Sequence, residues 1–285
     1  MSSSTFSLLV ELTKGVHPNG RRSEGAYTEL QDIADEYGYK GYVKVRVADV
    51  IPIDPIAIDK SLYSFALCAH FDFLACDANY VPVFAVEFDG PYHQDPKQKQ
   101  RDKNKDALCR LASFPRLRIN DRHLLRRYNK ASLLKWIISA WELQKAFEAA
   151  QEKGSIPSEE DFDPIFLWHQ GKTIEEVHPH WIALKPRLHI EQLKKLGRIP
   201  QGHTNGFQFV DENDNYRGIE WIDISDNTIV FVGSAMRSQN FPLHLWQLFT
   251  ELITVILYGK LILFLKSGAG QSKPDEVEGR LDSLT

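Results

Sequence analysis

The sequence predicts an α/β fold in which helices flank a mixed β-sheet, and three patterns lead to this prediction. Apolar residues recur at helical spacing from 23 to 37. Apolar and basic residues then alternate from 42 to 51, which is the period of a half-buried strand. Two more apolar stretches, 68–76 and 81–88, are separated by turn-forming residues, so they predict an antiparallel hairpin.

Two helices frame these strands. The first has Ser23 as a candidate N-cap and ends at Gly38. The second is rich in lysine, covers 97–114, and is stopped by Pro115. Three apolar side chains of this second helix are expected to face the core: Ala107, Leu108 and Leu111.

The remaining chain suggests a second domain. A short strand is predicted at 117–119 and a long amphipathic helix at 132–153, and the polar run 154–163 is typical of a linker. We therefore expect an N-terminal α/β domain over residues 1–153, a C-terminal α+β domain over 164–266, and a disordered tail over 267–285.

Composition places the protein among soluble globular chains, with 43% hydrophobic and 25% charged residues. The N-terminus has no basic region ahead of its short apolar run, so it does not predict a secretory signal, and a cytoplasmic location is expected. Cys68, Cys76 and Cys109 lack CxxC spacing. They predict buried free thiols rather than a disulfide framework or a zinc ribbon.

The apolar stretch 241–266 leaves three alternatives, which are a membrane span, a buried helix, or a helix followed by a strand. Four polar residues interrupt it: His244, Gln247, Glu251 and Lys260. A charged side chain at mid-bilayer costs about 2.5 to 3.5 kcal/mol, so we expect no membrane span.

Basic residues are concentrated in one segment. Between Lys97 and Lys130 there are twelve Lys or Arg residues and three Asp residues, a local charge of +9 in a chain whose net charge is -4. Such a segment is typical of a surface that faces phosphate, although a solvated helix face is the alternative. Five of these residues are candidate nucleic-acid contacts: Lys97, Lys99, Arg101, Lys103 and Arg126.

Three carboxylates stand in the predicted hairpin. Asp72 lies in the first strand, and Glu87 and Asp89 lie at the end of the second. Side chains at i and i+2 share a face of a strand, and hairpin pairing can bring Asp72 opposite them. Clustered like charges need a cation, so the set predicts a Mg²⁺ or Mn²⁺ site, whereas acids at a sheet margin that only aid solubility are the alternative.

Further polar residues follow the hairpin. His93 could act as a general base or contact phosphate, although a lone histidine after a strand is more often a surface residue. Asp102 and Lys105, at i and i+3 on the second helix, could point back at the same site or form a surface ion pair.

The residues from Arg22 to Ile119 resemble the nuclease-related branch of the PD-(D/E)XK superfamily, which includes proteins similar to very-short-patch-repair endonucleases. The matching residues are Glu24 on the first helix, Asp72 in an apolar strand, Glu87, Asp89, Gly90 and His93 at the next strand end, Arg101, Asp102 and Lys105 on the following helix, and Leu117, Arg118 and Ile119 in the last strand.

The resemblance implies a restriction-endonuclease-like mixed sheet and Mg²⁺- or Mn²⁺-dependent hydrolysis of phosphodiester bonds in nucleic acid, with DNA the expected partner. It implies catalytic roles for Glu24, Asp72, Glu87, Asp89, His93 and Lys105, with metal ligation by Asp72, Glu87 and Asp89. The lysine that names the superfamily would stand at Asp89, so Lys105 or His93 would have to take its electrostatic role.

Two classes of function remain after this comparison. One is an active nuclease, and the other is an inactive nuclease-fold module that binds nucleic acid or protein. The C-terminal region is a candidate surface for a protein partner or a second copy of the chain. Weaker candidates are a zinc site at His169, His178 and His180, and a calcium loop at Asp211, Glu212 and Asp214, for which a solvated turn is the alternative.

Overall fold

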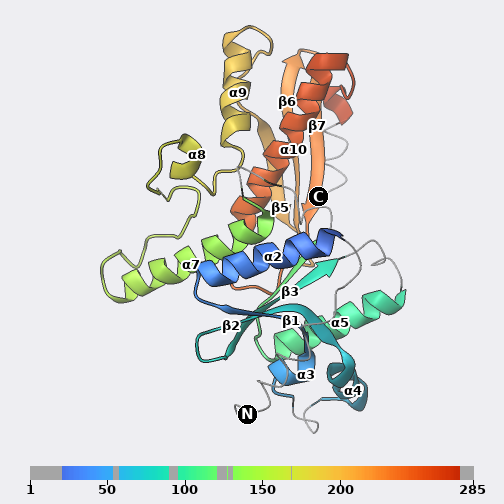
Figure 1. The fold of residues 1–285 in the computed structure, drawn as a ribbon. Helices are drawn as coiled ribbons and strands as arrows, with labels where there is room; N and C mark the ends of the chain where they lie inside the picture. Colours follow the sequence, from blue (N-terminus) through green and yellow to red (C-terminus); the bar gives the residue numbers. More distant parts are fainter. Residues whose placement is uncertain are drawn as a thin grey trace. The chain divides into compact units, whose positions relative to one another are not determined.

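The computed structural model describes residues 21–53, 58–89, 96–120, 127, 131–167 and 169–276, with the side chains of 21–24 excepted. The chain divides into two compact units. Unit 1 contains residues 1–142 together with Gln239–Leu243, and unit 2 contains Leu143–Ser238 and His244–Thr285. Figure 1 shows the elements of both units. The division falls inside one long helix, Leu133–Glu152 (α7).

Unit 1 is built on a mixed four-stranded sheet. Its strands are β1 (Lys40–Arg46), β2 (His70–Cys76), β3 (Pro82–Asp89) and β4 (Arg116–Asn120), in the order β1-β2-β3-β4. The first two pairings are antiparallel and the third is parallel. The predicted α/β class and the antiparallel hairpin are therefore confirmed.

Helices cover both faces of this sheet (Figure 1). One face carries α2 (Arg21–Glu36), and the other carries α3 (Val47–Val50), α4 (Lys60–Cys68) and α5 (Pro96–Leu111). Gly38 follows α2 with φ 74°, a left-handed conformation that glycine adopts without steric cost.

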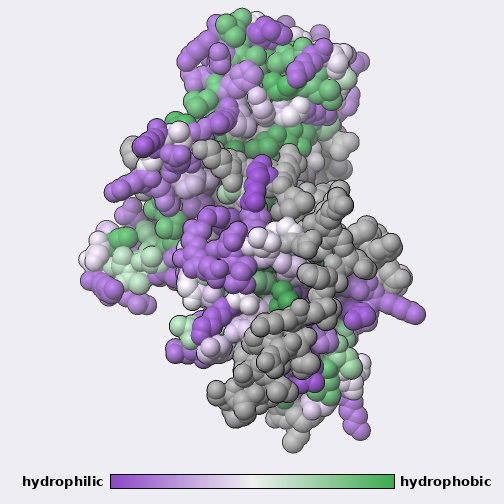
Figure 2. Space-filling model, in the orientation of Figure 1, coloured by the Kyte–Doolittle hydropathy of each residue, from purple (hydrophilic) through white to green (hydrophobic). Residues whose placement is uncertain are grey.

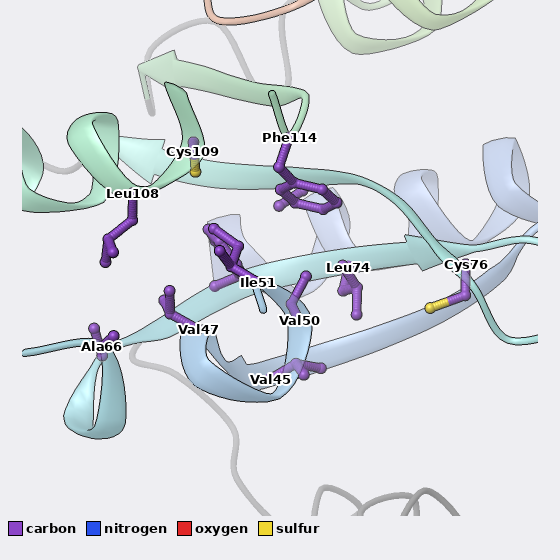
Figure 3. Close-up of a cluster of buried hydrophobic side chains, with 13 residues drawn as sticks. Val45, Val47, Val50, Ile51, Ala66, Leu74, Cys76, Leu108, Cys109 and Phe114 are labelled. Atoms are coloured by element: carbon purple, nitrogen blue, oxygen red, sulfur yellow. The ribbon is translucent and has the colours of Figure 1, made fainter. Parts of the chain in front are cut away.

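The core of unit 1 lies between the sheet and α3, α4 and α5. Figure 3 shows Val45 from β1, Leu74 from β2, Leu108 and Cys109 from α5, and Phe114 directed into this cluster. Burying each of these larger apolar side chains contributes roughly 1.5 to 3 kcal/mol to the free energy of unfolding. The sheet is thereby fixed against α5, which carries the basic residues.

Some local predictions in unit 1 were wrong. Leu111 is 70% exposed, because α5 ends there and Ser113, with φ 48°, returns Phe114 to the core instead. The strand predicted to reach residue 51 ends at Arg46, where Val47 begins α3 and donates its N–H to Ala69 O.

Helix boundaries also differ from the prediction. The first helix begins at Arg21, so Ser23 lies inside it and is not its N-cap. The sequence analysis did not anticipate α4, which is capped by the Asp59 carboxylate accepting from Leu62 N at 2.9 Å. Cys68, at the end of α4, is exposed, whereas Cys76 and Cys109 are buried as expected.

A distant segment covers the outer edge of β4. Arg116 N donates to Asn240 O at 2.6 Å, and Arg118 N donates to the Gln239 side-chain oxygen at 2.8 Å. Phe241 packs against Trp141, with ring centroids 4.8 Å apart. We call Gln239–Leu243 the edge segment. It supplies partners to backbone groups that a bare edge strand would leave without partners.

Unit 2 combines a three-stranded antiparallel sheet with helices. Its strands are β5 (Asn205–Val210), β6 (Tyr216–Ser225) and β7 (Thr228–Met236), in that order. Its helices are α8 (Ile174–Val177), α9 (Leu184–Lys195) and α10 (Trp246–Ser267).

Within the apolar stretch 241–266 the residues from Trp246 onward form the single helix α10, so the alternative of a helix followed by a strand was wrong. Among the described residues, α10 is long and apolar enough to cross a membrane, a test that the core helix of a soluble protein also passes. It packs on β6 and β7, and its Glu251 is 1% exposed and accepts from Ala183 N at 2.6 Å. Figure 2 shows hydrophobic side chains on the surface in the region that Figure 1 draws as α9 and α10.

The predicted tail is described as far as Glu276. Within it, Ser272 pairs with Ile229 of β7, each N–H donating to the other residue's carbonyl oxygen at 2.9 to 3.0 Å. Residues 277–285 lie outside the described part of the chain.

The edge segment generates a stability prediction. Phe241 is 9% exposed and contacts aromatic rings of unit 1, so Phe241→Ala should lower the free energy of unfolding of unit 1 by about 3 kcal/mol. Hydrogen exchange at the β3 and β4 amides, combined with urea unfolding, measures the change. Phe166→Ala is the control, because Phe166 is 72% exposed. Equal stability of the two variants would show that the edge segment does not support unit 1.

Candidate functional site

The site begins where β2 and β3 separate. Their ladder pairs Phe73 with Val86 and does not continue to Asp72, although both strands do. Beyond this point the Asp72 carboxylate accepts from Phe88 N at 2.9 Å. The Asp72 carboxylate thus replaces a backbone partner for Phe88 N, and this hydrogen bond fixes the carboxylate against β3.

Lys105 of α5 closes the other side of this opening. Its ammonium donates to both Glu87 oxygens at 2.7 Å and to His70 O at 2.6 Å. Both side chains of the Lys105–Glu87 pair are 12% exposed. The prediction that Lys105 points back toward the carboxylates is therefore confirmed.

Glu87 is a buried carboxylate, 9% exposed. Burial raises the pKa of Glu87, the Lys105 ammonium opposes that rise, and the Asp72 charge adds to it. Asp72 accepts from the N–H of Phe88, the residue that follows Glu87 on β3, so the Asp72 carboxylate lies against the same part of that strand.

Asp89 has a different environment. Arg118 on β4 donates from Nη2 to Asp89 at 2.8 Å and to Asp102 of α5 at 2.6 Å. Arg116, two residues earlier, pairs with Asp106 of α5. These pairs join β3, β4 and α5 through alternating charges, and they hold Asp89 toward Arg118.

The sequence analysis missed Lys44 as a site residue. Lys44 lies on β1, and its ammonium pairs with the Asp72 carboxylate. Its backbone has φ 54°, a left-handed conformation that costs an L-residue roughly 1 to 2 kcal/mol. The β1–β2 ladder pairs Val43 and Val45 but skips Lys44, so the strain coincides with the Asp72 contact.

Tyr27 of α2 is a second missed residue. Its ring packs edge-on against Phe88, with centroids 5.2 Å apart. Burial raises the pKa of the Tyr27 hydroxyl, and the Asp72 and Glu87 charges raise it further. The hydroxyl therefore stays protonated at neutral pH, which makes it a hydrogen-bond donor near the two carboxylates.

The donor chemistry of this site suits a hard cation only in part. Asp72 and Glu87 are carboxylates on adjacent strands, and carboxylates are the ligand type that Mg²⁺ and Mn²⁺ prefer. In the described part of the chain, however, no group of three His, Cys, Asp or Glu side chains is placed to hold one metal ion. A cation would therefore bind Asp72 and Glu87 at the expense of their lysine contacts, with Asp89 remaining on Arg118.

The other predicted site residues are distributed as follows. Lys97, Lys99, Arg101 and Lys103 lie on α5 and are exposed. Glu24 lies on α2, but its side chain is outside the described part of the structure. His93 and Arg126 lie outside the described residues altogether.

The weaker candidates are in unit 2. The rings of His169 and His180 lie 5.8 Å apart, and burial lowers the pKa of His180 to about 4. With His178 they form no metal-binding group in the described chain. Asp211 accepts from the N–H groups of Asn213 and Asn215 in the turn between β5 and β6, an arrangement of the solvated-turn type.

The Lys105–Glu87 pair generates a second prediction. Lys105→Met leaves a buried carboxylate without its cation, which should lower the free energy of unfolding by about 3 kcal/mol at neutral pH. The raised pKa of Glu87 gives the effect a pH dependence, since the folded state then holds the proton more tightly than the unfolded chain. Stability of the variant should be highest in acid and fall as the pH rises from about 4.5 through the raised pKa.

Urea unfolding at several pH values measures this effect. The double variant Lys105→Met/Glu87→Gln should recover much of the loss, because no buried charge remains. Lys103→Met, on the exposed side of α5, is the control. A Lys105→Met protein as stable as this control at every pH would contradict the assignment.

A comparison with known families gives one match. The family model described as "Protein of unknown function (DUF2726)" matches residues 21–132, which run from α2 to just before α7. No curated protein and no solved structure matches the chain significantly. The match includes Lys44, Asp72, Glu87 and Lys105, and it excludes the edge segment and all of unit 2.

Proposed function

We propose that unit 1 is a Mg²⁺- or Mn²⁺-dependent nuclease that hydrolyses phosphodiester bonds, with DNA as its substrate. The observation that carries the proposal is that Asp72 is bonded to the main chain of β3 one residue after Glu87, where β2 and β3 separate, and that the basic helix α5 reaches Glu87 through Lys105. Carboxylates placed next to a phosphate-binding surface repel the substrate unless a cation joins them.

The topology supports a PD-(D/E)XK assignment. The order helix α2, strand β1, antiparallel hairpin β2–β3, helix α5 and parallel strand β4 is the arrangement expected of a restriction-endonuclease-like fold. Asp72 and Glu87 lie on the two hairpin strands, as the resemblance implies.

In this proposal Asp72 and Glu87 hold the cation. When bound, a divalent cation supplies charge stabilisation to the phosphate and lowers the pKa of an attacking water. Lys105 stays beside the site through its second anchor at His70 O, and Arg118 keeps Asp89 oriented through Asp102. The exposed lysines of α5 bind the phosphate backbone and read little base sequence.

One observation favours the second candidate, a docking module without catalysis. Each of the three carboxylates has a basic partner, namely Lys44 for Asp72, Lys105 for Glu87 and Arg118 for Asp89. Such a neutralised set needs no metal ion. The experiments below separate the two candidates.

The basic surface generates a prediction about salt. Replacing Lys97, Lys99 and Lys103 with Gln should weaken binding of duplex DNA and flatten its salt dependence. Each lost phosphate contact should reduce the slope of log K against log salt by about 0.9. Replacing Lys145, Lys153 and Lys172, which lie in unit 2, is the control. An unchanged slope in the α5 variant would remove α5 from the binding surface.

The metal site generates the sharper prediction. Asp72→Asn keeps the acceptor for Phe88 N and removes the charge, so it should abolish Mn²⁺-dependent cleavage of plasmid DNA while DNA binding persists. Added Mn²⁺ should raise the melting temperature of the wild type and of the control Asp32→Asn, but not of Asp72→Asn. Equal Mn²⁺ stabilisation of all three proteins, with no cleavage of DNA or RNA by the wild type, would favour the docking module.

A further inference from the structure

Lys44 stands apart from the other basic residues of the site. It is the strand residue whose backbone adopts φ 54°, and its position opposite Asp72 is skipped in the β1–β2 ladder. Any residue without a left-handed preference is disfavoured there, and glycine or asparagine would fit better. A lysine on such a backbone, paired with Asp72, points to a role for its side chain at this place.

The two lysines at the site differ in what holds them. Lys105 is 12% exposed and is anchored by both Glu87 oxygens and by His70 O. Lys44 is 33% exposed, and its ammonium pairs with Asp72. An ammonium carries three donors. Among the residues that the structure describes, Lys44 donates to Asp72, whereas Lys105 uses all three of its donors.

We propose that Lys44 is a catalytic residue that binds the phosphodiester group of the substrate directly. This inference rests on the proposed nuclease function and adds a residue from β1 to that site. With a cation held on Asp72, the Lys44 ammonium would be released from that carboxylate and would lie beside the entering phosphate. There it donates to a phosphate oxygen and stabilises the charge that develops on it.

The strained backbone of Lys44 allows a test that separates loss of catalysis from loss of stability. Lys44→Asn and Lys44→Gly both suit a positive φ and both remove the ammonium, so these variants should unfold at the same urea concentration as the wild type or a higher one. Their rate of Mn²⁺-dependent plasmid cleavage should nevertheless fall by about 100-fold. Lys44→Arg should retain part of the rate, because it keeps a cation at this place.

A matched control lies on the same strand. Lys40 contacts Ala78 O at 3.0 Å, at the end of β1 away from Asp72, and Lys40→Asn should cleave as the wild type does. Binding is measured separately, with a short phosphorothioate duplex and Ca²⁺. Lys44→Asn should lose about 0.9 of the salt slope of binding, the share of one phosphate contact, and Lys40→Asn should lose none.

Each outcome bears on the inference. If the wild type cleaves and Lys44→Asn and Lys44→Gly cleave equally fast, Lys44 does not act on the phosphate and the nuclease assignment stands. If both variants lose stability and cleavage together and Lys44→Arg is equally inactive, Lys44 only supports Asp72 and the inference is overturned. If the wild type cleaves nothing, the nuclease assignment fails, and the salt dependence of DNA binding then decides about Lys44. A smaller salt slope in Lys44→Asn alone would still identify Lys44 as a phosphate contact. Equal salt slopes in Lys44→Asn and Lys40→Asn would show that Lys44 does not contact phosphate.

Discussion

The site depends on one constraint, which is that the backbone groups freed where β2 leaves β3 must find new partners. A buried N–H or C=O without a partner costs about 1 to 3 kcal/mol. The Asp72 carboxylate satisfies Phe88 N, and the Lys105 ammonium satisfies His70 O. An acid and a base are therefore fixed at the opening by the sheet itself, and Glu87 is held there as the partner of Lys105. The charge pattern of the site follows from this break in the ladder.

Much of the fold of unit 1 could be predicted from the sequence, because hairpin strands and amphipathic helices have periods that are visible in the residues. The strands around Asp72 and Glu87 were found in this way, and so was the short strand that carries Arg118. Leu111 was misplaced because its spacing is correct for the core, whereas the positive φ of Ser113 ends the helix there and substitutes Phe114. The spacing of apolar residues does not reveal where a residue such as Ser113 adopts a positive φ and ends a helix.

The candidate site was predictable only for residues on the hairpin and on α5. Lys44 was missed because its contact with Asp72 depends on strand register and on a left-handed backbone, and neither is readable from an alternating Val-Lys-Val pattern. Tyr27 was missed for a related reason, since its ring reaches the carboxylates from a helix on the opposite face of the sheet. Contacts of this kind arise from packing, which sequence spacing does not encode.

The edge segment has a consequence for how the chain folds as it is synthesised. Arg118 and Gln239 are 121 residues apart in the sequence, yet they are hydrogen-bonded across the edge of one sheet. Domains emerging from the ribosome usually fold in order from the N-terminus. Here the β4 edge stays uncovered while the 121 residues from Arg118 to Gln239 are added. A contact over such a sequence separation raises the contact order and slows folding, and an uncovered strand edge can pair with other chains in the meantime.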